Sequence, residues 1–282
     1  MKKILVLGAT GKVGSEMVKQ LSDRGIEVLA ATRNPENYQA QKNVKPVRFN
    51  YGDNSNLDEI FAGVEAAFLM SAPLDPDAFA HLKPVIDKVK EKGVGKIVLL
   101  SALGVDQNDQ APLRQIEKYI EGSDINYTFL RPNFFMDNFY PGWIYNSIKS
   151  SGVFYIPAEK EKTSFIAVSD IALAGVTALL NEGHAGKAYN LTGSESLNHD
   201  EVAEIISKYS SKPIKYVSIS DDDMRKAMKE MGVGAGQIEY MSALYMAVRK
   251  GYTEAVDPML EKLINKKSKT FDEWANENAE HF

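Results

Sequence analysis

Residues 1–21 read MKKILVLGATGKVGSEMVKQL, and this stretch decides the fold. Ile4 to Leu7 form an unbroken apolar run, which is typical of a parallel strand covered on both faces. After a glycine-rich turn, apolar residues recur at the spacing of an amphipathic helix, at Val13, Met17, Val18 and Leu21. Gly25 then offers the left-handed conformation in which helices commonly end. The stretch therefore predicts a strand, a glycine turn and a helix.

The same start has a second interpretation, a secretion signal, because two lysines precede the apolar run. A signal peptide needs roughly 7–15 apolar residues followed by a cleavage site with small residues. Here Gly8 interrupts the run, and Lys12 and Glu16 follow soon after it. We therefore expect no signal peptide.

The composition is that of a globular protein, because 44% of the 282 residues are apolar and 25% are charged. The chain has no cysteine, which excludes disulfides, thiol catalysis and cysteine-ligated metals and predicts a reducing, cytoplasmic location. No apolar run approaches the roughly 20 residues of a membrane helix, so no membrane partner is expected. The net charge of −5 argues against a nucleic-acid partner, which needs a basic surface. The oligomeric state stays open.

Strands and helices alternate through the first half of the chain. After the first strand, further strands are expected at residues 26–32, 44–50, 66–70, 96–101 and 126–130, with helices at 56–62, 77–92 and 113–121. Strands separated by helical segments predict an α/β fold, a doubly wound parallel sheet with helices on both faces.

The pattern loosens in the second half of the chain. Strands are expected at 165–168 and 189–192, and helices at 170–180, 200–209, 221–231, 236–249 and 270–279. We predict a core at residues 1–132 and a smaller, mostly helical C-terminal lobe at residues 133–282. The lobe is expected to build a substrate pocket over the strand ends and to be interleaved with the core, at a boundary that the sequence leaves open.

The glycine turn has the chemistry of a phosphate cradle. Glycines at Gly8, Gly11 and Gly14 permit a tight turn, close approach of the backbone to a phosphate, and close packing of helix on strand. The amides at the start of the helix then face a pyrophosphate. We predict a dinucleotide cradle formed by Gly8, Thr10, Gly11, Lys12, Val13 and Gly14. A tight turn without a ligand is the alternative.

The end of the second strand selects the cofactor. An NAD site usually has an acidic residue there for the ribose 2′-hydroxyl, whereas an NADP site has an arginine nearby for the 2′-phosphate. This chain has no carboxylate there until Glu36, and Arg33 follows the strand directly. Guanidinium binds phosphate through two parallel hydrogen bonds. We therefore predict NADP(H), with Lys12 as a possible second cation; a surface role for both side chains is the alternative.

Two further turns follow strands that lie along such a cofactor. Asp53 comes after the third strand, where its carboxylate can accept a hydrogen bond from an adenine amino group. A turn-forming aspartate is the alternative. Ser71, Ala72 and Pro73 follow the fourth strand, where small residues let the ribose and nicotinamide pass.

Several longer motifs occur in one order along the chain. They are GATGKVG, ATRNP, YGD, LDEIFAGVEAAFLMS, KIVLLSALG, YTFLRPNFFMDN, GKAYNLTGSESLNHDEVAEII and KTFDEWANENAEHF. Together they resemble the NmrA-like family of atypical short-chain dehydrogenases/reductases, over nearly the whole chain. The resemblance implies a Rossmann-like fold that binds NADP(H). It also implies that Arg131, Pro132, Asn133 and Phe134 lie beside the nicotinamide, and that Phe134, Phe135 and Asn138 lie near the substrate cleft. Ordinary core packing is the alternative for the aromatic rings.

The usual proton-transferring pair of short-chain dehydrogenases, a tyrosine with a lysine four residues later, has no match in the expected place. The spacing occurs at Tyr145 and Lys149, but after the RPNFF segment, so we interpret it as coincidence. The helix where related reductases carry a lysine or histidine has Leu113 and Arg114 instead, and Lys118 comes one turn too late.

Ser101, at the end of the fifth strand, is the one catalytic candidate, because its hydroxyl can hydrogen-bond a carbonyl substrate. A serine satisfied by the backbone is the alternative. Histidines occur four times, and none pairs at the spacing of metal ligands, so no metal is expected: His81, His184, His199 and His281.

Two functional hypotheses follow. The first is an NADPH-dependent reductase of a small electrophile such as a quinone or azo dye, with solvent as the proton source; the resemblance favours it. The second is a non-catalytic NADP(H)-binding redox sensor that reports to a partner, which the missing tyrosine–lysine pair favours. A nucleotide-sugar epimerase shares the fold but normally needs that pair, so it ranks below both.

Overall fold

The computed structural model describes residues 2–282. The chain forms two compact units. The first consists of the chain up to Pro132 together with Val168–Asn190, and the second of Asn133–Ala167 together with Leu191–Phe282. The chain therefore leaves the first unit after Pro132 and returns to it for one helix and most of one strand. The sequence-based division at residue 132 did not specify which segment returns.

The first unit contains a seven-stranded sheet with the strand order β3-β2-β1-β4-β5-β6-β8. The strands are β1 (Lys3–Val6), β2 (Glu27–Thr32), β3 (Val44–Arg48), β4 (Ala66–Leu69), β5 (Lys96–Leu100), β6 (Tyr127–Pro132) and β8 (Lys187–Leu191). Each pairing among β1 to β5, and that of β5 with β6, is parallel. The predicted Rossmann-like fold is confirmed. The order reverses beside β1, and ligands bind at such a reversal, beyond the carboxyl ends of the strands.

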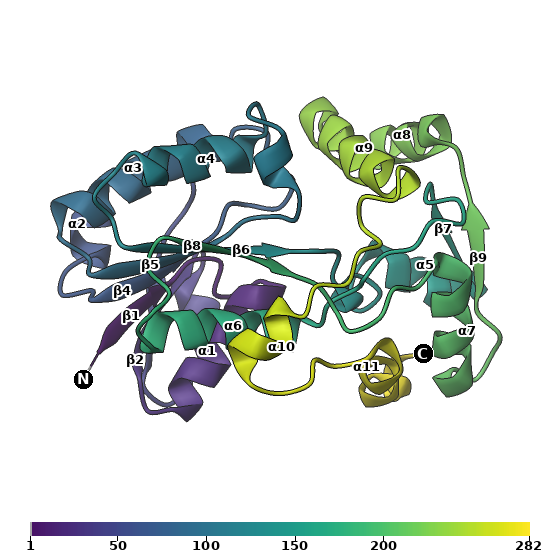
Figure 1. The fold of residues 1–282 in the computed structure, drawn as a ribbon, viewed down its shortest axis with the longest axis horizontal. Helices are drawn as coiled ribbons and strands as arrows, with labels where there is room; N and C mark the ends of the chain where they lie inside the picture. Colours follow the sequence, from purple (N-terminus) through teal and green to yellow (C-terminus); the bar gives the residue numbers. More distant parts are fainter. Residues whose placement is uncertain (1) are drawn as a thin grey trace. The chain divides into compact units, whose positions relative to one another are not determined.

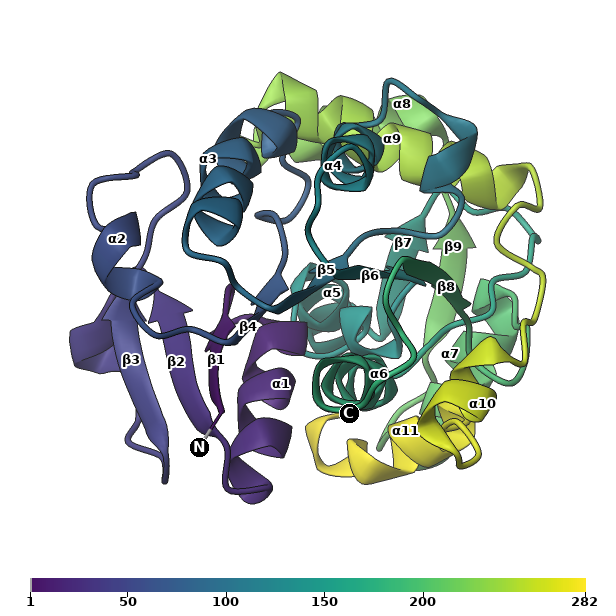
Figure 2. The same ribbon diagram turned by 60° about the vertical axis from the view of Figure 1, so that its left-hand side comes forward.

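Helices cover both faces of this sheet (Figures 1 and 2). On one face lie α2 (Leu57–Ile60), α3 (Ala78–Glu91) and α4 (Pro112–Glu121), and on the other lie α1 (Lys12–Asp23) and α6 (Val168–Leu180). Short 3-10 helices follow β2 and β5, at Pro35–Asn37 and Val105–Gln107. The side chains of Ile4, Leu5, Val6 and Leu7 are fully buried, as the unbroken apolar run predicts.

Helix α1 ends where the sequence predicts. Gly25 has a φ of +73°, and its N–H donates to the carbonyl of Ser22. The N–H of Ile26 then donates to the carbonyl of Leu21, which closes the left-handed helix end. The chain is thereby turned directly into β2.

The second unit contains a two-stranded parallel sheet and several helices. Its elements are a 3-10 helix at Met136–Asn138, α5 (Trp143–Ser151), β7 (Val153–Ile156), α7 (His199–Tyr209), β9 (Lys215–Ser218), α8 (Asp221–Glu230), α9 (Ala235–Arg249), α10 (Met259–Ile264), α11 (Phe271–Glu277) and a 3-10 helix at Ala279–His281. Strands β7 and β9 form the sheet. The unit is mostly helical, in agreement with the predicted lobe.

An aromatic core holds this unit together. The ring of Phe139 makes edge contacts with Phe154, Phe165 and Phe271 at centroid distances of 5.5–5.7 Å. His199 packs into the same cluster and is 2% exposed. Burial lowers the pKa of His199 to about 4, so this histidine is a neutral core residue at neutral pH.

One expected strand is wrong, and besides the 3-10 helices four elements were not predicted. Residues 165–168 form only an isolated bridge between Ile166 and Phe135, and Val168 already begins α6. The unpredicted elements are α5, β7, β9 and α10. Within residues 2–282, the structure has no helix with the length and apolar character needed to cross a membrane.

Candidate functional site

The turn between β1 and α1 is built to approach a ligand closely. Gly8 has a φ of +63°, and the N–H of Gly11 donates to its carbonyl at 2.8 Å. Gly11 is the N-cap of α1 and supplies no side-chain cap, and the first turn of α1 has no acidic residue. Neither the N-cap residue nor the first turn of α1 therefore supplies a negatively charged side chain to the positive N-terminal end of the helix. These features fit a pyrophosphate.

The third glycine serves packing. A Cβ atom at Gly14 would lie 2.1 Å from the carbonyl oxygen of Gly8, so only glycine lets α1 sit this close to the turn. Val13 is 2% exposed and packs in the core, so its side chain is not available to a ligand. Thr10 is exposed, and Lys12 is half-buried at the first position of the helix.

Arg33 lies at the carboxyl end of β2, directly after Thr32, and is exposed. Within residues 2–282 its guanidinium group makes no hydrogen bond or ion pair. An unpaired cation at this place has the chemistry to bind a 2′-phosphate.

A second arginine, which the sequence analysis missed, lies next to it. Arg48 ends β3 and is the register partner of Thr32. Its Nη1 donates to the carbonyl oxygen of Arg33 and its Nη2 to Oε2 of Glu36, each at 2.9 Å. The parallel pairing of β2 with β3 is the signal that could have found it.

Asp53 is exposed in the turn after β3. Its Oδ1 accepts a hydrogen bond from the backbone N–H of Ser55 at 3.0 Å. Hydrogen bonds with Ser55 hold the pKa of Asp53 below its usual range. This is the turn-forming geometry that the sequence left as the alternative, and contact with an adenine stays a prediction.

The turns after β3 and β4 are joined by polar contacts that the sequence analysis did not predict. The hydroxyl of Tyr51 donates to the carbonyl of Met70 at 2.5 Å. Asp75 pairs with Nδ1 of His81 at 2.7 Å, and the His81 ring faces Gly52. These contacts fix the loop that carries Ser71, Ala72 and Pro73, of which the first two are half-buried and the third exposed.

Ser101 follows β5 and is 6% exposed. Its backbone N–H donates to the carbonyl of Leu130 at 2.7 Å. Its Oγ is buried and has no hydrogen-bond partner in the part of the chain that the structure describes. A buried hydroxyl without a partner costs about 1–3 kcal/mol, and contact of Ser101 with a substrate stays a prediction. The alternative in which the backbone satisfies this hydroxyl is therefore not what the structure shows.

The start of α4 offers no proton donor. Leu113 is 8% exposed and belongs to the core. Nη1 of Arg114 donates to Glu117 and Glu121, each at 2.9 Å. Lys118 is half-exposed and pairs with Asp109 at 2.7 Å. These side chains serve packing and ion pairing.

Arg131 has a structural partner rather than a free guanidinium. Its Nε and Nη2 donate to the two carboxylate oxygens of Glu117, at 2.9 and 2.8 Å, and its Nη1 lies 3.2 Å from Asp106. The Glu117 side chain is fully buried. The buried ion pair fixes the end of β6 against α4, where the carbonyl of Pro132 accepts a hydrogen bond from Leu103.

The residues after Pro132 belong to the second unit. Phe134, Phe135 and Asn138 are all half-buried, and Phe134 packs against the hydrophobic core of the second unit, as the core-packing alternative predicts. Phe134 contacts the Tyr245 ring at a centroid distance of 5.8 Å. Asn133 is buried and donates from Nδ2 to Oγ of Ser164 at 2.8 Å, which fixes the start of this segment.

The pair at tyrosine–lysine spacing lies on α5 of the second unit. The ammonium of Lys149 lies over the ring of Tyr145, 5.6 Å from its centroid. The ring itself contacts Tyr140 and Phe282. Since the ammonium faces the ring rather than the hydroxyl, this geometry does not activate the phenol, which agrees with the interpretation as coincidence.

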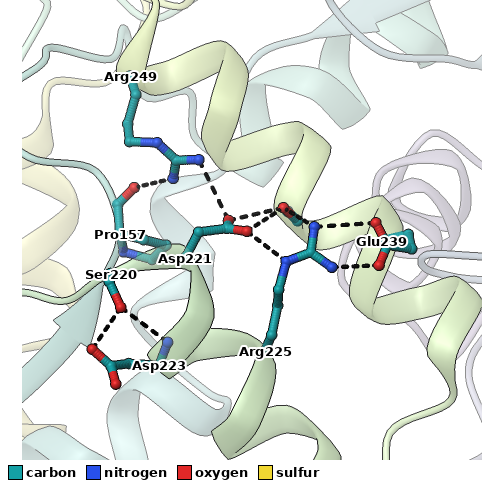
Figure 3. Close-up of polar contacts among 8 residues, drawn as sticks. Pro157, Ser220, Asp221, Asp223, Arg225, Glu239 and Arg249 are labelled. Carbon is teal, nitrogen blue, oxygen red and sulfur yellow. Dashed lines mark hydrogen bonds and ion pairs between the residues drawn. The ribbon is translucent and has the colours of Figure 1, made fainter.

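The second unit also has a dense polar cluster that joins α8, α9 and the loop after β7 (Figure 3). Asp221 accepts hydrogen bonds from Arg225 at 2.5 Å and from Ser242 at 2.8 Å, and Arg225 also pairs with Glu239. Arg249 donates to the carbonyl of Pro157 at 2.7 Å. Asp221 pairs with Arg225 and Arg249, and Glu239 pairs with Arg225, and these contacts connect α8 with α9.

No group of three or more histidine, aspartate or glutamate side chains is arranged to hold a metal ion among residues 2–282. The sheet order and the glycine turn are those of a Rossmann-like fold that binds dinucleotides, and Arg33 lies where such folds meet the adenosine ribose.

The model of the NmrA-like family matches residues 1–275. The chain belongs to the NmrA-like family, and the predicted resemblance is confirmed.

Known relatives extend over nearly the whole chain. The NAD(P)H azoreductase of Xenophilus azovorans is 30% identical over 286 aligned positions, covering 99% of each chain. The (4-alkanoyl-5-oxo-2,5-dihydrofuran-3-yl)methyl phosphate reductase of Streptomyces griseus subsp. griseus is 31% identical over 291 positions, again covering 99% of each. The solved structure of the NADPH-dependent quinone oxidoreductase QOR2 of Escherichia coli, complexed with NADPH, has a TM-score of 0.84 and 26% identity. It covers 98% of this chain and 99% of that one.

Proposed function

We propose that this protein is an NADPH-dependent reductase that transfers hydride to a small conjugated electrophile such as a quinone, without a tyrosine–lysine pair. The observation that carries the proposal is the combination at the carboxyl edge of the sheet. The glycine cradle, the Arg33 guanidinium and the buried Ser101 hydroxyl lie there, and neither side chain has a hydrogen-bond partner within residues 2–282.

The residues of the first unit fit NADPH. The amides of Gly11 and its neighbours face the pyrophosphate, and Arg33 binds the 2′-phosphate. Asp53 contacts the adenine end, and the loop with Ser71, Ala72 and Pro73 leaves room for the ribose and nicotinamide, whose far side faces Pro132. An NADPH-bound relative with the same fold supports this assignment.

The reaction needs little acid–base chemistry from the protein. NADPH supplies a hydride, with its electron pair, to the electrophile. For a quinone, the hydride and one proton from solvent give the hydroquinone, and NADP⁺ is released. An azo bond takes up the same hydride and proton across its two nitrogens. This chemistry fits a site where Leu113 and Arg114 occupy the positions at which related reductases carry a proton donor.

The relatives support this substrate class. The azoreductase and the quinone oxidoreductase are named for substrates with conjugated double bonds. We propose that Ser101 contacts the substrate, since its buried hydroxyl has no hydrogen-bond partner within residues 2–282. Contact of Phe134, Phe135 and Asn138 with a substrate stays a prediction from the resemblance. A direct test is to measure NADPH oxidation with a panel of quinones.

Replacing Arg33 with alanine is expected to weaken NADPH binding by about 10- to 100-fold and to leave NADH binding within about twofold, because only NADPH carries the 2′-phosphate. Calorimetric titration of both cofactors measures this difference. Arg24, an exposed arginine at the end of α1, gives the matched control, and Arg24→Ala should change neither affinity. Equal losses for both cofactors in Arg33→Ala would rule out the 2′-phosphate role.

Replacing Ser101 with alanine is expected to lower kcat for quinone reduction by about tenfold or more, because a positioned hydroxyl stabilises charge that develops on the carbonyl oxygen. The Oγ has no partner within the described residues, so the midpoint of thermal unfolding should stay equal or rise. Steady-state kinetics and a thermal melt test both statements. Unchanged kcat would show that Ser101 does not contact the substrate.

A non-catalytic NADP(H) sensor is the second candidate, favoured by the same start of α4 without a proton donor. A sensor binds NADPH and oxidises at most one equivalent, whereas a reductase turns over repeatedly. Turnover counting with the quinone panel therefore separates the two functions.

A further inference from the structure

The turn that follows β2 is held by a side chain from the neighbouring strand. Arg48 bridges two points of this turn, with one nitrogen on the carbonyl oxygen of Arg33 and another on the carboxylate of Glu36, each at 2.9 Å. Asn56 holds Arg48 in turn, by donating to its backbone carbonyl at 2.7 Å. The guanidinium of Arg33 itself takes no part in these contacts.

Glu36 is the first carboxylate after β2, and in a dinucleotide site this region decides between the two cofactors. A carboxylate there accepts hydrogen bonds from the ribose hydroxyls of NADH and repels the 2′-phosphate of NADPH. The ion pair with Arg48 engages Oε2 of Glu36 and places a positive charge beside the carboxylate. The chain thus carries an NADH-type acid that is masked by a cation from β3.

We propose that the Glu36–Arg48 pair is a specificity device: Arg48 masks Glu36, and the preference for NADPH depends on this masking as well as on Arg33. The inference rests on the proposed NADPH site. Arg48 is here a positioning residue, since it acts through Glu36 and through the backbone of Arg33. Glu36 is the residue that would favour NADH over NADPH if its carboxylate were not paired with Arg48.

The pair can be removed without unfolding the protein. The side chains of Arg48 and Glu36 are 60% and 56% exposed, and exposed ion pairs contribute little to stability. Changes in cofactor affinity after substitution of Arg48 or Glu36 therefore reflect altered contacts at the cofactor site and not unfolding of the protein. A thermal melt of each variant verifies that the fold is retained.

The test measures dissociation constants for NADPH and NADH by calorimetry, in the wild-type protein, Arg48→Ala, Glu36→Gln and the double variant. In Arg48→Ala the ratio of NADPH to NADH affinity is expected to fall about tenfold or more, through weaker NADPH and tighter NADH binding. Adding Glu36→Gln to Arg48→Ala is expected to restore at least half of the lost ratio on a logarithmic scale, because the exposed carboxylate is then gone. Glu36→Gln alone should keep the NADPH preference.

Two controls sharpen the result. Lys45 is exposed on the same strand, and Lys45→Ala removes an equal charge without touching the turn, so its cofactor preference should equal that of the wild type. Arg48→Lys keeps the charge that masks Glu36 and should keep most of the preference. If Lys45→Ala lost as much of the NADPH preference as Arg48→Ala, the effect would come from the overall positive charge of β3 and not from the masking of Glu36.

The proposal is overturned if Arg48→Ala leaves the affinity ratio unchanged. It is also overturned if Glu36→Gln fails to restore the ratio in the double variant, because Arg48 would then act only as a cation for the phosphate. Failure of the wild-type protein to bind NADPH at all would instead refute the proposed cofactor site, and the two failures are thus distinct.

Discussion

Replacing Glu117 with alanine lowers the free energy of unfolding by about 3–5 kcal/mol, the expected cost of removing one partner of a buried ion pair. Glu117 is fully buried and accepts two hydrogen bonds from Arg131, at 2.9 and 2.8 Å. Its removal leaves the 8%-exposed Arg131 with only Asp106 as a partner. Chemical denaturation of the purified variant measures this loss.

Glu121 provides the matched control for this prediction. It lies on the same helix and accepts a hydrogen bond from Arg114 at the same 2.9 Å as Glu117 does, but its side chain is 34% exposed. Glu121→Ala should cost no more than about 1 kcal/mol. Equal losses of unfolding free energy in Glu117→Ala and Glu121→Ala would show that the burial of Glu117 does not determine how strongly its ion pairs stabilise the protein.

Replacing Gly14 with alanine is expected to lower NADPH affinity by about 100-fold or more and to destabilise the protein by about 1–3 kcal/mol. The added Cβ would lie 2.1 Å from the carbonyl oxygen and 2.6 Å from the carbonyl carbon of Gly8, both backbone atoms. Either α1 moves away from the turn or the turn changes shape, and both changes displace the amides that we propose face the pyrophosphate. Calorimetric titration and a denaturation curve measure the two effects.

The other end of the same helix offers the control that separates binding from stability. Gly25 has a φ of +73°, and a Cβ atom added there would meet no atom of residues 2–282 within 4 Å apart from its chain neighbours, so Gly25→Ala introduces backbone strain alone. The variant should lose about 1 kcal/mol of stability and keep its NADPH affinity. If Gly25→Ala lost NADPH binding to the same extent, the effect of Gly14→Ala would reflect destabilisation and not the shape of the cradle.

The features that the sequence predicts correctly are local. The strand, turn and helix at the start of the chain depend on residues within about one helix of each other, and Gly25 ends α1 because its own backbone conformation allows it. Arg33 could be placed at the end of β2 because it follows that strand directly. Strands that alternate with helices predict a parallel sheet. Because the connections between parallel strands are right-handed and un-knotted, only a few strand orders remain for this sheet.

The features that the sequence analysis missed depend on contacts between distant residues. Arg48 reaches Glu36 only because β3 pairs with β2 in one register, and Glu117 meets Arg131 only when α4 packs beside β6. The expected strand at residues 165–168 is apolar enough for one, but Ile166 finds a single bridge to Phe135. Strands β7 and β9 are four residues each and separated by 58 residues of chain, so neither has a strong local signal.

The most direct test of the proposed reductase is the absorbance of NADPH in the presence of simple quinones, followed after calorimetry has shown that NADPH binds. We predict oxidation of many equivalents of NADPH per protein molecule, at a rate that depends on the quinone and falls in Ser101→Ala. Tight NADPH binding with no more than one equivalent oxidised across the whole quinone panel would contradict the reductase. That result would identify the protein as a sensor of NADP(H).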